Sequence, residues 1–291
     1  MPWQNERTHG QWFYSAAVDG EPLDVCALRT ALAERAKRVA RLDVVERTGS
    51  TNVDLLAAAR AGAPDRSVLI AERQDAGRGR LDRSWASPPG AGLTFSVLLR
   101  PSEVPPARLG WLPLLAGLSV LRAVRGCTTL PSALKWPNDV LLGPAHGKCA
   151  GILAEACHGV ERGDQAIVVG IGLNVGTRRD ELPPGATSLR AEGVQVDRAD
   201  VVVALLGQLL EDETRWRSAR GDPDAIGLRV AYRQECATLN RPVRVALPGG
   251  AVLTGTARDV DGDGRLVLRE DSGALRSVAA GDVVHVRAMP S

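Results

Sequence analysis

The stretch Gln74-Asp-Ala-Gly77-Arg78-Gly79-Arg80-Leu-Asp-Arg83-Ser-Trp85 lies between two apolar segments typical of strands, residues 67–72 and 93–99. We call residues 74–92 the arginine loop. Alternating glycines let backbone N–H groups turn toward one centre, and such nests bind anionic oxygens. The arginines add forked donors that suit a carboxylate or a phosphate. A flexible, solvated basic loop is the alternative, and the stretch lacks the spacing of a Walker A P-loop. The sequence therefore predicts an anion site on a loop between two strands.

Hydrophobic periodicity predicts the elements on both sides of this loop. Apolar residues at helical spacing predict helices over 23–41, 51–61, 105–125, 198–217 and 223–236. Apolar runs bounded by turn residues predict strands over 42–46, 67–72, 93–99, 134–136, 140–142, 148–156 and 165–175. Thr51 and Asp54 have the spacing of a capping box, with Thr51 opening the second helix.

The pattern changes after about residue 238. Glycine-containing turns separate short predicted strands over 243–247, 252–258, 266–269, 275–278 and 283–287. Strands of this length and spacing are typical of a small barrel. We therefore expect an α+β fold in three parts: a mobile leader over residues 1–21, a mixed-sheet domain over 22–237 and a small β-barrel over 238–291.

Composition narrows the class of function. The chain has 291 residues, with 36 Lys and Arg against 34 Asp and Glu, so a broad surface for DNA or for an anionic membrane is not expected. Five cysteines without C-x-x-C spacing argue against a disulfide framework or a structural zinc site. The charged N-terminus lacks a signal peptide, and the longest apolar run, Trp111–Leu121, is too short to span a bilayer. We expect a cytoplasmic protein.

A second segment with chemical potential is Lys135-Trp-Pro-Asn-Asp139. Pro137 stiffens a turn between two strand pieces, and the oxygens of Asn138 and Asp139 can then face a cation or a phosphate. An Asx turn that closes a hairpin is the alternative.

Two predicted strands carry further candidates. Lys148 begins one of them, and a period of two places it on the same face as Ala150 and Ile152. A lysine there can reach water, or it can place its ammonium at the mouth of a pocket. Gly170 and Gly172 lie inside the next strand, where they indicate close approach of a ligand or a second backbone, or a routine bulge.

The order and spacing of these segments resemble those of the biotin protein ligases, in particular the short, non-repressor type. The resemblance covers about residues 40–290. It implies a catalytic domain of the biotin/lipoyl ligase type followed by an SH3-like β-barrel. The matching pieces are Gly49-Ser-Thr-Asn52, the motif from Gln74 to Trp85, Lys135-Trp-Pro-Asn-Asp139, Gly147-Lys-x-Ala-Gly-Ile152, Gly170-x-Gly-x-Asn174 and Thr187-Ser-Leu189.

The resemblance also implies a reaction. The biotin carboxylate attacks the α-phosphate of ATP, biotinyl-5′-AMP forms and pyrophosphate leaves. A lysine of a biotin carboxyl carrier protein or carboxylase subunit then attacks the mixed anhydride, and AMP leaves. No covalent enzyme intermediate is needed, which agrees with the lack of a nucleophile motif. Positive charge and Mg²⁺ are needed around the reacting groups.

By the same resemblance, each site residue has an implied role. The catalytic residues are Lys148, which is the first choice, Arg80 and Asp139, and Asp139 is also a possible Mg²⁺ ligand. The biotin-binding residues are Ser50, Thr51, Asn52, Gln74, Gly77, Arg78, Gly79, Arg80, Trp85, Lys148 and Gly151. The ATP-binding residues are Arg78, Arg80, Arg83, Asn138, Lys148 and Asn174.

Two expectations concern the surroundings of this site. We expect the rings of Trp85 and Trp136 to line it, and Trp111 to lie in the core. We also expect the arginine loop to be mobile until an anion arrives, because its arginines would otherwise lack partners. Asp82 departs from the family pattern, which often has glycine there.

Two other classes of function are compatible with the same segments. A lipoate or octanoate ligase on the related fold would share Lys148, and a nucleic-acid-binding module would use the barrel and the basic loop. Only about forty residues with one predicted helix precede the first motif, so we expect no operator binding. The chain can be a monomer or a homodimer.

Overall fold

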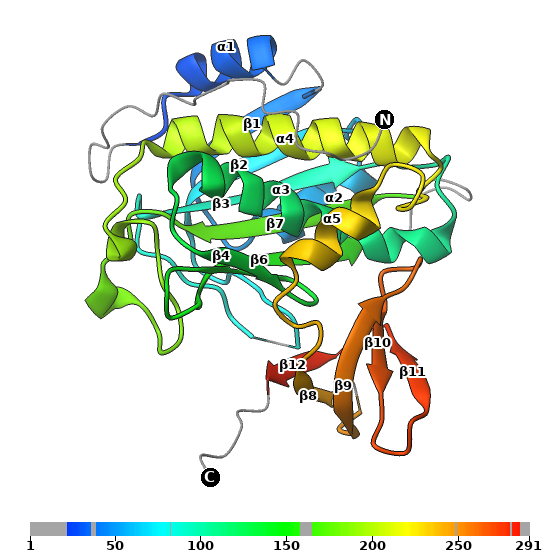
Figure 1. The fold of residues 1–291 in the computed structure, drawn as a ribbon. Helices are drawn as coiled ribbons and strands as arrows, with labels where there is room; N and C mark the ends of the chain where they lie inside the picture. Colours follow the sequence, from blue (N-terminus) through cyan, green and yellow to red (C-terminus); the bar gives the residue numbers. More distant parts are fainter. Residues whose placement is uncertain are drawn as a thin grey trace.

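The computed structural model describes residues 22–35, 39–81, 83–157, 165–247, 249–279 and 281–285. The predicted leader over residues 1–21 lies outside them, and so does Asp82, the residue that departs from the family pattern. One mixed sheet has the strand order β1-β2-β3-β7-β6-β5-β4 (Figure 1). Its strands are β1 (Arg41–Thr48), β2 (Ser67–Gln74), β3 (Gly92–Leu99), β4 (Ser132–Lys135), β5 (Asp139–Leu142), β6 (Gly147–Ala156) and β7 (Ile167–Asn174). Strands β1 and β2 are parallel, and the other neighbours are antiparallel.

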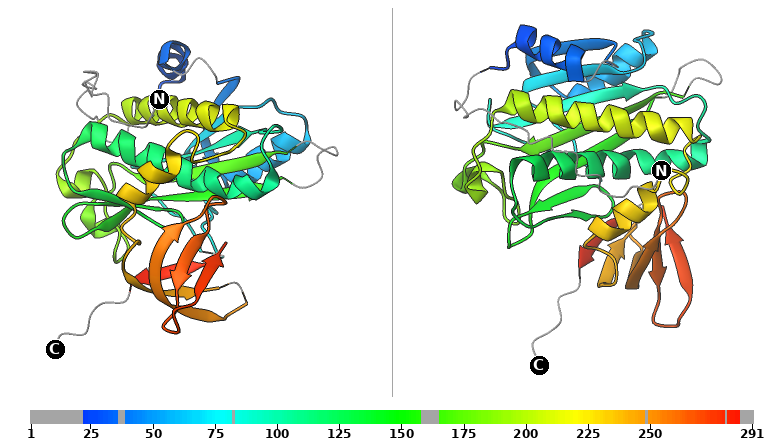
Figure 2. Two further views of the ribbon diagram at one scale, coloured as in Figure 1. Left: turned by 45° about the vertical axis from the view of Figure 1, so that its right-hand side comes forward. Right: turned by 45° about the horizontal axis from the view of Figure 1, so that its top comes forward.

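Helices cover the two faces of this sheet unequally. α3 (Leu112–Cys127) and α4 (Arg198–Ser218) pack on one face, α1 (Val25–Arg35) lies against α4, and α5 (Leu228–Glu235) lies against α3 (Figure 2). α2 (Thr51–Arg60) contacts β2, β3 and β7 from the other face. Short 3-10 helices occur at Pro106–Trp111, Arg179–Glu181 and Arg190–Glu192.

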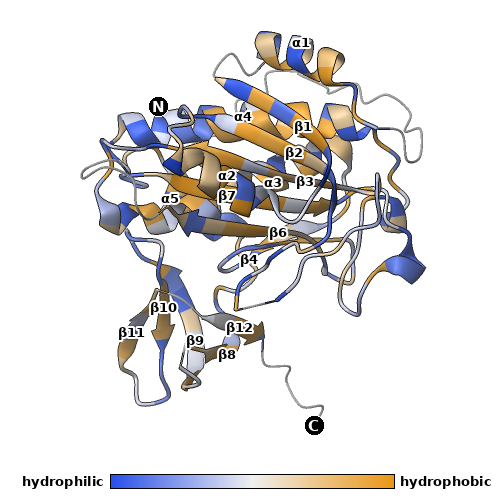
Figure 3. Ribbon diagram, turned by 180° about the vertical axis from the view of Figure 1, so that it is seen from behind, coloured by the Kyte–Doolittle hydropathy of each residue, from blue (hydrophilic) through white to orange (hydrophobic). Residues whose placement is uncertain are grey.

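Side-chain alternation along β3 explains this layering. Val97 and Leu99 point into the core under α3 and α4, whereas Leu98 belongs to a smaller apolar cluster under α2. Thr94 and Ser96 share the α2 face and are buried as well, so that face carries polar groups inside a hydrophobic strand. Figure 3 views the sheet from this side, and its central strands are largely hydrophobic. The α2 face is therefore where a polar pocket can form.

Several local predictions need correction. The first helix ends at Arg35, the predicted helix over 105–125 begins as a 3-10 helix, and the last one starts only at Leu228. The predicted capping box is wrong: the N-cap of α2 is Ser50, and the hydroxyl of Thr48 donates to the Asp54 carboxylate instead. By length and composition, Pro106–Cys127 could span a membrane, and 67% of its 18-residue window is buried inside the protein. Its helix α3 packs against α4 and β6.

The C-terminal region forms a second sheet, antiparallel throughout, with the order β11-β10-β9-β8-β12. Its strands are β8 (Pro242–Ala246), β9 (Val252–Val260), β10 (Leu266–Arg269), β11 (Leu275–Val278) and β12 (Asp282–His285). It projects below the main sheet in the view of Figure 1.

Two tryptophans of the mixed-sheet domain hold the turn between β9 and β10. The indole Nε1 of Trp111 donates to the Gly262 carbonyl at 2.9 Å, and that of Trp136 donates to the Gly264 carbonyl at 3.2 Å. Both rings are almost fully buried. The prediction that Trp136 lines the ligand site is therefore wrong, because its ring serves the contact between the domains. Trp111 is in the core as predicted, but its polar tip serves the same contact.

The Thr238 hydroxyl links Trp136 to His285 at the start of the C-terminal domain, and this contact predicts how stability depends on pH. Thr238 is fully buried and accepts from the Trp136 backbone N–H at 3.0 Å. Its own hydrogen is then left to donate to Nε2 of His285, 3.2 Å away. Burial and the nearby Lys135, Arg241 and His146 lower the pKa of His285 from 6.5 to about 4.

Because the unfolded chain binds this proton and the folded one does not, the free energy of unfolding should fall as pH drops through 6.5 and level off near 4. His285→Gln keeps an acceptor near the Nε2 position but cannot titrate. Thermal unfolding at about pH 7.5 and about pH 5 should therefore show a smaller loss of stability in the variant than in the wild type. An equal loss in both proteins would contradict this role of His285.

Candidate active site

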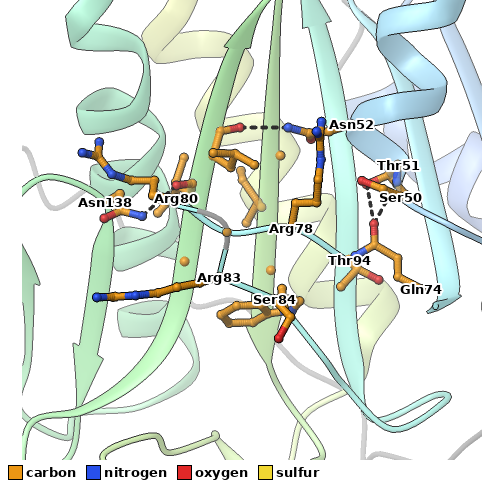
Figure 4. A pocket seen from close by; sticks show the side chains of 18 of the residues that line it. Ser50, Thr51, Asn52, Gln74, Arg78, Arg80, Arg83, Ser84, Thr94 and Asn138 are labelled. Atoms are coloured by element: carbon orange, nitrogen blue, oxygen red, sulfur yellow. Dashed lines mark hydrogen bonds between the residues drawn. The ribbon is translucent and has the colours of Figure 1, made fainter. Parts of the chain in front are cut away.

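A pocket opens on the α2 face of the sheet, between the N-terminus of α2, the arginine loop and strands β3, β5, β6 and β7 (Figure 4). It brings together most of the residues that the resemblance selected. Those that line it are Ser50, Thr51, Asn52, Gln74, Arg78, Gly79, Arg80, Arg83, Trp85, Asn138, Asp139, Lys148 and Gly151. Gly77 and Asn174 do not line it.

One end of the pocket is built from neutral polar groups. The Oε1 atom of Gln74 accepts from the Thr51 backbone N–H at 2.8 Å and lies 3.0 Å from the Thr51 hydroxyl. Within the described residues, Nε2 of Gln74 donates to no partner. Ser50 sits at the N-cap of α2 without capping it through its side chain. This end therefore offers a donor amide and hydroxyls to a ligand with polar ring atoms.

Asn52 lines the same end, but its amide is used within the protein. Nδ2 donates to the Leu153 carbonyl at 3.2 Å and to a carboxylate oxygen of Glu155 at 2.7 Å, while Oδ1 accepts from Ser96 at 2.6 Å. A Cβ added at Gly170 would come within 2.1 Å of Oδ1. Both amide hydrogens are thus donated within the protein, and Asn52 links α2, β3 and β6. Its contact with biotin stays a prediction.

The arginine loop is closed by its own backbone. The Gly79 N–H donates to the Arg83 carbonyl at 2.6 Å, and the Trp85 N–H donates to the Gly77 carbonyl at 2.8 Å. A Cβ at position 77 would lie 2.2 Å from the Trp85 carbonyl oxygen, so only glycine fits in this closed loop. The contact of Gly77 with biotin stays a prediction. The loop keeps a defined turn through these bonds.

Two arginines of the loop already have partners in the protein. Nη2 of Arg78 lies 2.7 Å from Oε1 of Glu155, and Nη2 of Arg80 donates to the Gly281 carbonyl of the C-terminal domain at 3.1 Å. The reason given for a mobile loop, arginines without partners, is therefore wrong. Arg83 is exposed at the pocket edge.

Lys148 reaches the pocket because of a β-bulge. Strand β6 pairs Ala150 with Val140 but Lys148 with Leu141, so Cys149 is the extra residue. The bulge resets the alternation and moves Lys148 from the core face to the face of Gly151, which corrects the predicted strand face. Its Nζ lies 2.6 Å from a carboxylate oxygen of Asp139 and 5.7 Å from the centre of the Trp85 ring.

The Trp85 ring lies on two paired glycines. Gly151 of β6 and Gly172 of β7 are register partners. A Cβ at Gly172 would come within 2.3 Å of the Trp85 ring, and one at Gly151 within 3.1 Å. The glycine pattern in β7 thus marks close approach by a protein side chain. The Trp85 ring and the two glycines together form an apolar wall beside the cationic Lys148.

The asparagines expected to bind ATP lie in different places. Nδ2 of Asn138 donates to the Ile152 carbonyl at 3.0 Å while the residue lines the pocket. Asn174 is buried, and its amide donates to the Thr187 carbonyl at 3.0 Å, which ties β7 to the following loop. Asn174 does not line the pocket, and its contact with ATP stays a prediction.

The described residues contain no group of three or more His, Cys, Asp or Glu side chains that could hold a metal ion. Asp139 is a single carboxylate, and its closest charged partner is Lys148. A protein-only Mg²⁺ site does not fit these residues.

Three polar residues of this region had no predicted role: Thr94, Ser96 and Glu155. Thr94 lines the pocket and Ser96 is fully buried beneath it. Polar residues at alternate positions of an otherwise apolar strand were the available signal for the first two. Glu155 shares a strand face with Gly151, but only the fold shows that Arg78 lies opposite.

The arrangement separates a neutral polar end from a cationic end. Among the described residues, three arginines and Lys148 line the pocket, while Asp139 lines it and Glu155 pairs with Arg78 beside it, so positive charge is in surplus there. Such a pocket can bind a ligand that has polar ring atoms at one end and negative charge at the other end.

Comparisons with known proteins agree with this geometry. Residues 44–174 match the model of the Biotin/lipoate A/B protein ligase family, and residues 238–286 match the Biotin protein ligase C terminal domain. The chain is 45% identical over 271 residues to the biotin–[acetyl-CoA-carboxylase] ligase of Mycobacterium tuberculosis, covering 91% of this chain and 97% of that one.

Other relatives extend the similarity. The bifunctional ligase/repressor BirA of Escherichia coli is 32% identical over 84% of this chain and 73% of its own length. The solved structure of biotin protein ligase from Aquifex aeolicus in complex with biotin and ATP superposes with a TM-score of 0.69 at 28% identity, covering 86% of this chain and all of that one. The mixed sheet, the antiparallel C-terminal domain and these identities lead to one assignment: the chain belongs to the biotin protein ligase family.

Proposed function

We propose that this enzyme is a biotin–protein ligase, which activates biotin with ATP and transfers it to a lysine of a carrier protein. The observation that carries the proposal is one pocket that joins the polar end at Thr51 and Gln74 to the cationic end at Arg80 and Lys148. The identity of 45% to a named biotin–[acetyl-CoA-carboxylase] ligase supports the same activity.

In the first step, a biotin carboxylate oxygen attacks the α-phosphorus of ATP. A carbon–oxygen–phosphorus anhydride forms, and the bond to the β-phosphate oxygen breaks, so pyrophosphate leaves. Lys148 and Arg80 stabilise the negative charge that gathers on the phosphate oxygens. Asp139 holds the Lys148 ammonium at 2.6 Å and so fixes where its charge acts.

In the second step, a carrier lysine attacks the carbonyl carbon of biotinyl-5′-AMP, forms an amide and displaces AMP. The enzyme provides orientation and charge, and no side chain is acylated. The name of the Mycobacterium tuberculosis relative indicates a carboxylase as the natural acceptor. We propose a biotin carboxyl carrier domain as the acceptor here.

A related activity, lipoate or octanoate ligation, shares a family model with biotin ligation. The polar end of the pocket favours biotin, because Gln74, Thr51 and Ser50 match the donors and acceptors of a ureido ring. An apolar dithiolane or alkyl end would leave these groups without partners. The C-terminal match to the biotin protein ligase domain favours the same choice.

We propose that Mg²⁺ enters with the triphosphate, because Mg²⁺ in such sites is commonly held by one or two carboxylates plus substrate phosphates. Among the described residues that line the pocket, Asp139 is the one carboxylate, and it is paired with Lys148. A chelator should therefore abolish exchange activity while biotin binding, measured by calorimetry without ATP, persists.

Biotin-dependent exchange of pyrophosphate into ATP tests the activity. We expect exchange with biotin and only background exchange with lipoate or octanoate. Transfer of biotin to a purified carrier domain, read by mass spectrometry, completes the test. Exchange that responds to lipoate and not to biotin would refute the proposal.

A further inference from the structure

A chain of hydrogen bonds runs beneath the pocket, from its polar end toward the arginine loop. The Ser96 hydroxyl lies 2.7 Å from that of Thr51 and 2.6 Å from Oδ1 of Asn52. Thr51 in turn contacts Gln74 at the polar end. Ser96 is fully buried on β3, so water does not compete for these bonds. Polar atoms of α2, β2 and β3 are thereby held in one arrangement.

The chain continues from Asn52 to the arginine loop through Glu155. One oxygen of Glu155 accepts from Asn52 at 2.7 Å, and the other accepts from Arg78 at 2.7 Å. Figure 4 shows Arg78 extended toward Asn52 across the pocket. Glu155 is thus the junction between the buried hydrogen bonds and the arginine of the loop.

The bond to Glu155 orients the Arg78 side chain and uses only one nitrogen of its guanidinium. Both short contacts to Glu155 come from Nη2 of the guanidinium. Within the described residues, its Nε and Nη1 atoms have no hydrogen-bond partner and remain available to an anion. The side chains of Arg78 and Glu155 are 45% and 25% exposed, and a pair this exposed contributes little to stability. The pair with Glu155 instead holds the Arg78 side chain in one rotamer.

We infer that Glu155, supported by Asn52 and Ser96, is a positioning residue that holds Arg78 in place for biotin binding. Glu155 touches no ligand and acts through Arg78. The inference deepens the proposed function and rests on it, because biotin is the ligand whose affinity reports the position of Arg78.

Glu155→Gln is the sharpest test, since it keeps the volume of the side chain. Its amide oxygen can still accept from Asn52, but the NH2 group that replaces the other oxygen cannot accept from Arg78, and the negative charge opposite the guanidinium is lost. We expect the dissociation constant for biotin, measured by calorimetry, to rise about tenfold, which is the effect of one charge-assisted hydrogen bond. The midpoint of thermal unfolding should stay close to the wild-type value.

A double-mutant cycle distinguishes positioning from a general structural role. If Glu155 acts through Arg78, then Glu155→Gln in an Arg78→Ala background should not weaken biotin binding further. Additive losses in the double variant, or unchanged affinity in Glu155→Gln, would overturn the inference. If the wild type itself fails to bind biotin, the proposed function fails and not this inference alone.

The chain offers a matched control. Arg125 and Glu235 form a pair at 2.6 Å with exposed fractions of 42% and 28%, and neither residue lines the pocket. Glu235→Gln removes the same kind of charge from the same kind of pair. Its biotin affinity should equal that of the wild type, and a similar tenfold loss there would also overturn the inference.

Discussion

Lys148→Ala should slow biotin-dependent ATP–pyrophosphate exchange by about two to three orders of magnitude, the effect of removing one preorganised charge at the reacting groups. The variant loses the ammonium and also leaves the Asp139 carboxylate without its partner at 2.6 Å, facing the phosphates. Exchange measured at saturating biotin and ATP reports this loss. The fold should persist, because Lys148 lies at a strand end and about a third of its side chain is exposed.

A second variant separates the charge from its position. Lys148→Arg keeps a positive charge beside the Asp139 carboxylate but changes its position, so exchange should recover in part over Lys148→Ala. The biotin dissociation constant should change less than the exchange rate, because the charge acts mainly on the phosphate. Exchange near the wild-type rate in purified, folded Lys148→Ala would remove Lys148 from the catalytic role.

Gly172→Ala should have the second largest effect, and it acts through packing. A Cβ at this position would lie 2.3 Å from the Trp85 ring, so the ring must leave its place on the sheet. Overpacking of this kind costs about 1–3 kcal/mol of stability. Because Trp85 forms one wall of the pocket, we expect biotin binding to weaken by up to about a hundredfold. Calorimetry and chemical denaturation measure the two effects separately.

Gly117→Ala is the control for this variant. A Cβ at Gly117 would meet Leu134 at 3.6 Å and Ile152 at 3.8 Å, which are ordinary contacts on the opposite face of the sheet. Since Gly117 lies inside α3, alanine there should stabilise the protein by about 0.5–1 kcal/mol without changing biotin affinity. Unaltered biotin binding in Gly172→Ala would show that Trp85 does not depend on this glycine.

Much of the candidate site could be predicted because its signals are local. The glycines and arginines of residues 77–83 follow one another directly, and the backbone bonds that close their turn span only a few residues. The turn with Asn138 and Asp139 is equally local. Strand patterns in β3 and β7 placed both strands correctly within one or two residues, since fully apolar runs bounded by turns leave few alternatives.

Other features depend on partners that are distant in the sequence. Trp136 follows a strand in the same segment as Asp139, yet its indole bonds to Gly264, 128 residues away. Glu155 meets Arg78, 77 residues away, and Arg80 reaches the Gly281 carbonyl, 201 residues away. Side-chain identity alone does not select such partners, because packing of whole domains brings them together.

The sequence by itself determined the α+β class, the position of the arginine loop, and the cations that make the pocket positive, since these follow from local periodicity and residue chemistry. Only the tertiary structure decided which face of the sheet carries Lys148. A single extra residue, Cys149, shifts the register of β6 against β5, and one such shift moves every preceding side chain to the other face. The period of two alone would bury Lys148 in the core.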